Sequence, residues 1–171
     1  VETKRVFCDL MRDVGVRCKP EEVMITSGAQ EALDLIAKAF IDPGDIILAE
    51  GPTYLGALQA FSAYEPDVRC IPFDREGMRM DLLEAELEKI GKGAAKFLYT
   101  IPNFQNPGGV TMSPARRQRL LELAEEYDFF VVEDDPYGRL RYDGGHVKPL
   151  KALNDQVVYL GTVSKVFAPG L

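Results

Sequence analysis

The sequence predicts an α/β domain of three layers (αβα), in which helices cover both faces of a mostly parallel sheet. Two observations predict this fold class. Short β-branched runs alternate with helical patterns of ten to fourteen residues, as in the crossover connections between parallel strands. Residues 129–132 are also continuously apolar, which is typical of a strand buried on both faces.

Six short runs are predicted strands because they are rich in β-branched and aromatic residues and are bounded by turn residues. They cover residues 23–26, 46–49, 68–72, 96–100, 129–133 and 157–160.

A first helix is predicted at residues 3–14, before the sheet, and a second at residues 31–40. The second helix has apolar residues at helical spacing, and the turn Asp42-Pro43-Gly44-Asp45 ends it. Its expected apolar residues are Ala32, Leu35, Ile36, Ala39 and Phe40.

Two further helices are predicted at residues 81–90 and 114–127. The second of these has the clearest start, with Ser113 as N-cap and Pro114 at the first helical position. The expected inward residues are Leu83, Leu87 and Ile90 in one helix, and Leu120, Leu121, Ala124 and Tyr127 in the other.

Composition excludes several classes of protein. The 171 residues are 46% apolar and carry a net charge of −7, which fits one buried domain and argues against both a disordered chain and a general nucleic-acid binder. No apolar run has the length of a membrane span. Cys8, Cys18 and Cys70 are scattered and odd in number, and His146 is alone, so we expect reduced thiols, a cytoplasmic location and no metal site.

Four predicted strands are followed by residues that can do chemistry. They are Ser27-Gly28-Ala29-Gln30 after the first strand, the segment 102–109 with Asn106, then Asp134-Asp135-Pro136-Tyr137, and Thr162-Val163-Ser164-Lys165. Because ligands of open α/β sheets bind beyond the carboxyl ends of the strands, we expect these groups to meet at one rim.

Each of these segments also has a plain structural interpretation. Ser27 and Gln30 have the spacing of a capping box, which is commoner than a phosphate site. Segment 106–109 is typical of a turn, and Asp134 and Asp135 could cap a helix that begins at Pro136. A lone lysine is most often solvated, but Lys165 follows a strand among apolar neighbours, where burial would lower its pKa and make its amine nucleophilic.

Together the motifs resemble those of class I/II aminotransferases, the pyridoxal-phosphate enzymes of fold type I. The resemblance lies in Gly28-Ala29-Gln30, Tyr54, Asn106-Pro107-Gly108, Asp134 with Tyr137, and Ser164-Lys165 before Ala168-Pro169-Gly170-Leu171. Segments 103–109 and 133–137 are most similar to the branch of 2-aminoadipate and kynurenine aminotransferases, which also includes the aminotransferase-like domains of MocR-type regulators. The resemblance runs from about Pro20 to Leu171.

The resemblance implies a role for each of these residues. Lys165 would bond to the aldehyde of pyridoxal 5'-phosphate and later move a proton between substrate and cofactor. Asp134 would pair with the ring nitrogen, Asn106 and Tyr137 would bind the phenolic oxygen, and Tyr54 would stack on the ring. The phosphate would lie at Gly28, Ala29 and Gln30, with help from Ser164 and Thr162, where the family commonly has Ser in place of Thr162.

The resemblance also implies the extent of the domain. We expect residues 1–171 to be the central part of an aspartate-aminotransferase-like large domain, incomplete because the small domain, both family termini and two substrate- or phosphate-binding arginines are absent. The parent protein would transfer an amino group from an α-amino acid to a 2-oxo acid as a homodimer, whereas this segment alone would be inactive. The alternatives are a fold type I lyase and a ligand-sensing domain of a MocR-type regulator.

Overall fold

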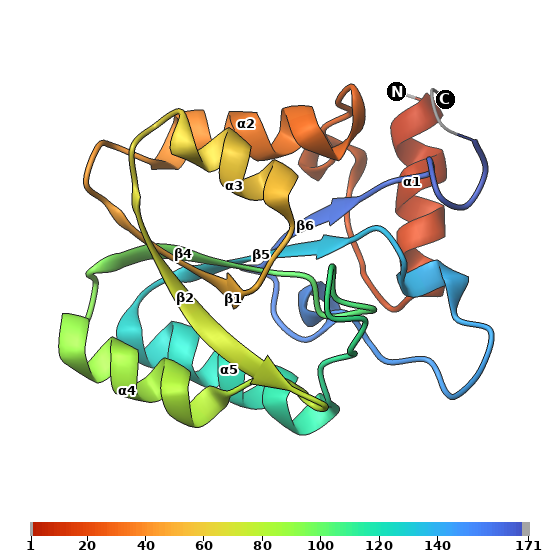
Figure 1. Ribbon diagram of the computed structural model, residues 1–171. Helices are drawn as coiled ribbons and strands as arrows, with labels where there is room; N and C mark the ends of the chain where they lie inside the picture. Colours follow the sequence, from red (N-terminus) through yellow and green to blue (C-terminus); the bar gives the residue numbers. More distant parts are fainter. Residues whose placement is uncertain (1, 169–171) are drawn as a thin grey trace.

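A computed structural model describes residues 2–168 of the chain, and Figure 1 shows a sheet between two helical layers. Within these residues, six strands form one sheet in the order β3-β2-β1-β4-β5-β6. All neighbouring strands are parallel except β2 and β3, which are antiparallel. The strands are β1 (Ile46–Gly51), β2 (Asp67–Asp74), β3 (Gly77–Met78), β4 (Ala95–Thr100), β5 (Phe130–Asp135) and β6 (Val158–Gly161). The predicted fold class is confirmed.

The helices divide between the two faces of the sheet. Helices α2 (Gly28–Phe40) and α3 (Leu55–Ser62) lie on one face, and α4 (Met80–Ile90) and α5 (Pro114–Tyr127) lie on the other (Figure 1). Helix α1 (Glu2–Asp13) lies beyond the end of β6. Short 3₁₀ turns cover Pro20–Glu22, Gly138–Leu140 and Leu150–Ala152. No helix among residues 2–168 combines the length and the apolar character that a membrane crossing needs.

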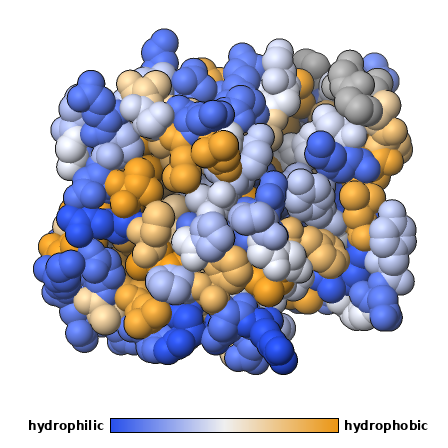
Figure 2. All heavy atoms as spheres, viewed as in Figure 1, coloured by the Kyte–Doolittle hydropathy of each residue, from blue (hydrophilic) through white to orange (hydrophobic). Residues whose placement is uncertain are grey.

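Each face of the sheet has its own buried cluster, because β1, β4 and β5 are covered on both sides. On the α2/α3 face, the ring of Phe61 meets Phe97 and Tyr99 edge-on, with ring centroids 5.5 Å apart in both pairs. On the α4/α5 face, Leu83 and Leu120 pack against the other side of the same strands. On the surface, hydrophobic residues lie between hydrophilic ones on the face shown in Figure 2.

The predicted helices α4 and α5 form as expected. Ser113 accepts a hydrogen bond from the backbone N–H of Arg116, and Pro114 occupies the first turn. The expected inward residues of both helices are buried or packed against the core: Leu83, Leu87, Ile90, Leu120, Leu121, Ala124 and Tyr127. The α3 helix escapes prediction because most of its residues are apolar, which hides the helical period.

The predicted apolar stripe of α2 is partly wrong. Its buried residues are Leu33, Ile36 and Ala37, whereas Leu35 and Phe40 are 38% and 47% exposed. The helix begins three residues earlier than the predicted residue 31, and its buried stripe includes Leu33, which the predicted list omits, whereas Ala39, which that list includes, is exposed.

The predicted strand at residues 23–26 is also wrong. The segment joins no sheet, and Met24 and Ile25 are 74% and 48% exposed. A β-branched run becomes a strand only where a partner strand and a packing surface meet it, and within residues 2–168 this run has no ladder partner.

We expect Leu33→Ala to lower the free energy of unfolding of the protein by about 2–5 kcal/mol, because it leaves a cavity in a fully buried site. Leu35→Ala, in the same helix but half-exposed, should cost less than about 1 kcal/mol. Urea unfolding followed by circular dichroism measures both values. Equal losses in the two variants would contradict the assignment of the buried face of α2.

Candidate functional site

The predicted rim is present at the carboxyl ends of the parallel strands. The strands β1, β4, β5 and β6 are parallel, so Asp134 near the end of β5 and the segments that carry Tyr54, Asn106 and Lys165 lie at the same end of the sheet (Figure 1). The start of α2 reaches the same region, because Nε2 of Gln30 donates to the carbonyl oxygen of Gly56 at 2.7 Å. The structure therefore brings all the predicted segments to one end of the sheet.

Asp134 is a buried acid at the centre of this rim. It lies on β5 and accepts a hydrogen bond from the hydroxyl of Tyr99 at 2.7 Å. Its pKa is raised to about 6, chiefly by burial and to a smaller extent by Asp135, although the hydrogen bond from Tyr99 lowers it in part. Within residues 2–168, no lysine or arginine forms an ion pair with it. A buried carboxylate without a cation favours a positively charged ligand, and a protonated ring nitrogen fits this requirement.

A second buried acid, Glu50, joins the loops that carry Tyr54 and Asn106. Its carboxylate accepts hydrogen bonds from Thr100 Oγ1 at 2.9 Å, from the Ile101 N–H at 3.0 Å and from Gln105 Nε2 at 3.2 Å. Burial raises the pKa of Glu50 to about 7, although these hydrogen bonds lower it in part.

The side chain of Gln105 connects Glu50 to both of these loops. Its Nε2 also donates to the Pro52 carbonyl oxygen at 2.8 Å, and its Oε1 accepts from the Gly108 N–H at 2.7 Å. Pro52 lies two residues before Tyr54, and Gln105 directly precedes Asn106. One buried amide thus holds the two loops at a fixed separation.

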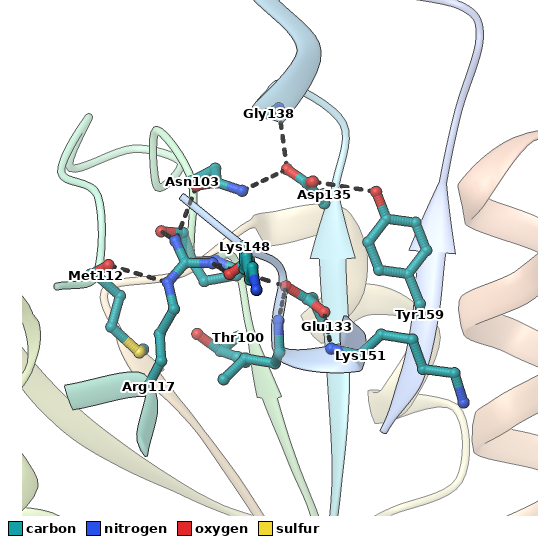
Figure 3. Close-up of polar contacts among 12 residues, drawn as sticks. Thr100, Asn103, Met112, Arg117, Glu133, Asp135, Gly138, Lys148, Lys151 and Tyr159 are labelled. Carbon is teal, nitrogen blue, oxygen red and sulfur yellow. Dashed lines mark hydrogen bonds and ion pairs between the residues drawn. The ribbon is translucent and has the colours of Figure 1, made fainter. Parts of the chain in front are cut away.

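A third buried acid, Glu133, lies below the rim on the other face of the sheet (Figure 3). Its two oxygens accept from the backbone N–H groups of Leu150 and Lys151, both at 2.9 Å, and the Arg117 guanidinium lies 4.0 Å away. Burial raises the pKa of Glu133 to about 7. Glu133 fastens the 3₁₀ turn that precedes β6.

The remaining predicted residues follow β4, β5 and β6. Asn106 and Tyr137 are half-buried in the turns after β4 and β5. After β6, the N–H of Ser164 donates to Thr162 Oγ1 at 3.2 Å. Residues 169–171, which carry part of the resemblance, lie outside the described residues.

The expected burial of Lys165 is wrong for the structure described. Lys165 is exposed, and its neighbour Phe167 is 66% exposed. The turn follows β6, which is an edge strand of the sheet within residues 2–168, so the apolar residues beside Lys165 have little surface to pack on.

The plain capping box at the start of α2 is also wrong. The side chain of Ser27 makes no capping hydrogen bond. Instead, the carboxylate of Glu31 accepts from the Ser27 N–H, and Gln30 reaches Gly56. Gly28 has a φ of +78°, which favours glycine. The first turn leaves the N–H groups of Ala29 and Gln30 without partners in the helix, as an anion site requires.

Asp134 and Asp135 do not cap a helix that begins at Pro136, because no helix begins there; the 3₁₀ turn starts at Gly138, whose N–H donates to Asp135. The rim also contains buried polar residues that the sequence analysis does not single out, namely Glu50, Tyr99, Asn103, Gln105, Arg117 and Glu133. One signal marks two of them: like Asp134, Glu50 and Glu133 are acids that end buried apolar strands, so they must find hydrogen-bond donors nearby.

A rim with a helix N-terminus, a buried acid and a lysine is compatible with a pyridoxal-phosphate-binding domain of fold type I. More narrowly, the chain belongs to the class I and II aminotransferases, whose family model matches residues 2–170. It is 62% identical over 154 residues to aromatic-amino-acid aminotransferase 1 of Thermococcus litoralis, a match that covers 87% of this chain and 37% of that protein.

Two solved structures support the same family. The kynurenine aminotransferase of Pyrococcus horikoshii, in complex with PMP, is 58% identical with a TM-score of 0.83, over 86% of this chain and 37% of that one. The alpha-aminoadipate aminotransferase of Thermus thermophilus, bound to N-(5'-phosphopyridoxyl)-L-leucine, is 41% identical with a TM-score of 0.86, over 98% and 42%. The ligands of these two relatives agree with the predicted cofactor, pyridoxal phosphate. The chain spans less than half the length of these relatives.

The buried acids predict how stability depends on pH. Burial raises the pKa of Glu50 to about 7 in the folded protein, from an ordinary value of 4.5. Between these values the folded chain holds a proton that the unfolded chain has released, so stability should fall as the pH rises from about 4.5 to about 7. Glu133 acts in the same direction.

We expect Glu50→Gln to flatten part of this fall, because the amide does not titrate. Urea unfolding at intervals between about pH 5 and pH 7.5 measures the slope. Glu125→Gln, at an exposed position of α5, is the matched control and should keep the slope of the unmodified protein. An unchanged slope in Glu50→Gln would show that Glu50 titrates normally.

Proposed function

We propose that the protein to which this chain belongs transfers an amino group from an α-amino acid to a 2-oxo acid in a two-stage, ping-pong reaction. The single observation that carries this proposal is Asp134, a buried carboxylate at the rim without a cationic partner among residues 2–168. Family membership and the 62% identity to an aromatic-amino-acid aminotransferase support it.

Pyridoxal phosphate would be held by groups from four segments. Asp134 would bind the ring nitrogen and keep it positively charged, because a carboxylate stabilises an adjacent cation in a buried site. Tyr54 would lie against the ring, and Asn106 and Tyr137 would donate to its phenolic oxygen. When bound, the cofactor supplies an aldehyde and an electron-withdrawing ring that weaken the Cα–H bond of the amino acid.

The phosphate would lie at the start of α2, at Gly28, Ala29 and Gln30. The backbone N–H groups and the positive end of the helix dipole favour an anion there. The hydroxyls of Thr162 and Ser164, in the turn after β6, would also donate hydrogen bonds to the phosphate.

Lys165 would be the catalytic residue. Its Nζ would hold the cofactor through the aldehyde group and, as a free amine, would accept the proton from Cα of the amino acid.

We further propose that the chain is the central part of the large domain of a cytoplasmic homodimer, with the small domain elsewhere in the parent protein. The chain spans 37–42% of the length of its relatives, which supports its assignment as a part of one domain of a longer protein. The free thiols of Cys8, Cys18 and Cys70 fit a reducing compartment. Tyr54 and Leu55 are exposed beside the rim, at 36% and 66%, which fits a surface that a partner covers.

The regulator alternative is less well supported. Two HTH-type transcriptional regulators of Bacillus subtilis are 33% and 31% identical to the chain, against 62% for the aminotransferase relative. A fold type I lyase would use the same rim, but it would break a further bond of the amino acid and leave the cofactor without the amino group, whereas aminotransfer yields a 2-oxo acid and leaves the amino group on the cofactor. Product analysis after a single turnover separates these reactions.

Lys165→Ala should abolish the visible absorption band that the protein acquires with pyridoxal phosphate, because the amine that bonds to the aldehyde is gone. Transamination should fall by about 10²–10⁴-fold, the contribution of a positioned acid–base group. Lys38→Ala, at an exposed position of α2, is the control and should leave both unchanged. A band that survives in Lys165→Ala would overturn the assignment.

Asp134→Asn should lower kcat by about 10²-fold or more, because the uncharged amide no longer stabilises the positive ring nitrogen. The variant has nearly the same shape and keeps a group that accepts from Tyr99. Steady-state kinetics with saturating cofactor measures the change, and Asp143→Asn, in an exposed loop, is the control. A kcat within a factor of two of the unmodified enzyme would exclude the proposed role of Asp134.

A further inference from the structure

Asp135, which directly follows Asp134, connects three segments of the rim. Its carboxylate accepts hydrogen bonds from Asn103 Nδ2 at 3.0 Å, from the Gly138 N–H at 2.9 Å and from the Tyr159 hydroxyl at 3.0 Å. Figure 3 shows these donors arriving from the loop after β4, from the turn after β5 and from β6. One carboxylate therefore ties together the ends of three neighbouring strands.

The donor from the β4 loop is itself held firmly. Asn103 is buried, and its Oδ1 accepts from Nη2 of Arg117 at 2.8 Å. Arg117 is fully buried and also donates to three backbone carbonyl oxygens at 2.9–3.0 Å, those of Pro102, Met112 and Lys148 (Figure 3). The Asn103 amide is thus fixed from both ends, so its contact with Asp135 sets where the loop lies.

The donor from the β5 turn is fixed by lack of space. A Cβ atom at Gly138 would lie 2.5 Å from both carboxylate oxygens of Asp135. The backbone can approach the carboxylate this closely only because residue 138 is glycine. The third donor, Tyr159, is half-buried, and Asp135 and burial together raise the pKa of its hydroxyl, which therefore keeps its proton to donate.

Each segment that Asp135 holds carries a residue of the proposed cofactor site. Asn103 lies three residues before Asn106, Gly138 directly follows Tyr137, and Tyr159 lies three residues before Thr162. We propose that Asp135 is a positioning residue for aminotransfer: it sets the mutual placement of Asp134, Asn106, Tyr137 and Thr162 through its three hydrogen bonds. This inference rests on the proposed function of the rim.

The placement of Asn106 and Tyr137 has a chemical consequence. Both would donate hydrogen bonds to the phenolic oxygen of the cofactor. Hydrogen bonds to the ionised form of a group favour that form, so they lower the pKa of the bound cofactor. A shift of either side chain by about 1 Å would weaken these bonds and can cost about 10²-fold in rate. Asp135 would therefore influence both kcat and the pH titration of the bound cofactor without touching it.

The test uses the full-length protein with its cofactor and the variants Asp135→Asn and Tyr159→Phe. Tyr64→Phe is the matched control, because it also removes a hydroxyl that donates to an aspartate, Asp34 at 3.1 Å, but does so on the exposed α2/α3 side. We expect kcat to fall by about 10- to 100-fold in Asp135→Asn and by a smaller factor in Tyr159→Phe. The pH midpoint of the visible band should rise in both and stay unchanged in Tyr64→Phe.

A readout without the cofactor separates positioning from general stability. Hydrogen exchange should become faster in segments 102–109 and 136–138 of Asp135→Asn, while α4 and α5 keep their protection. The proposal is overturned if the variants lose stability throughout but keep the kcat and the pH midpoint of the unmodified enzyme. If the unmodified protein acquires no visible band, the proposed function fails first, and the role of Asp135 fails with it.

Discussion

The buried carboxylates at the ends of the parallel strands are the constraint on which the rim depends. An ionised acid in an apolar sheet is costly unless several donors reach it. The buried Glu50 and Glu133 and the half-buried Asp135 obtain these donors from the loops that follow the strands. The requirement to satisfy the acids therefore decides where the loops lie, and the loops carry the groups that would bind the cofactor.

This arrangement divides the work between neighbouring acids of β5. Glu133 holds the backbone of the 3₁₀ turn on one face, and Asp135 holds the strand ends beside it. Asp134, between them in the sequence, points to the other face and meets Tyr99. Successive side chains of a strand alternate between faces. Glu133 and Asp135 can therefore hold neighbouring segments on one face, while Asp134 is available to a ligand on the other.

Much of the fold follows from the sequence pattern, because α4, α5 and the central strands β1, β4 and β5 each bury a regular apolar stripe or run. The pattern fails where packing, and not composition, decides the outcome. Residues 23–26 have the composition of a strand but no neighbour to pair with in residues 2–168, and the start of α2 uses Glu31 and Gln30 in place of the Ser27 side chain. The pattern of residues cannot show which donor reaches which acid, so Gln105 and Asn103 become visible only in three dimensions.

Gly56, which lies against the Tyr54 ring, determines where that ring can lie. A Cβ atom at Gly56 would lie 2.5 Å from the Tyr54 ring, while its carbonyl oxygen accepts from Gln30. The ring can fold over this residue only because the residue has no side chain. A larger residue at position 56 would therefore displace the Tyr54 ring and strain the hydrogen bond that anchors α2 through Gln30, so one substitution would disturb both the proposed ring-stacking residue and the helix proposed to bind the phosphate.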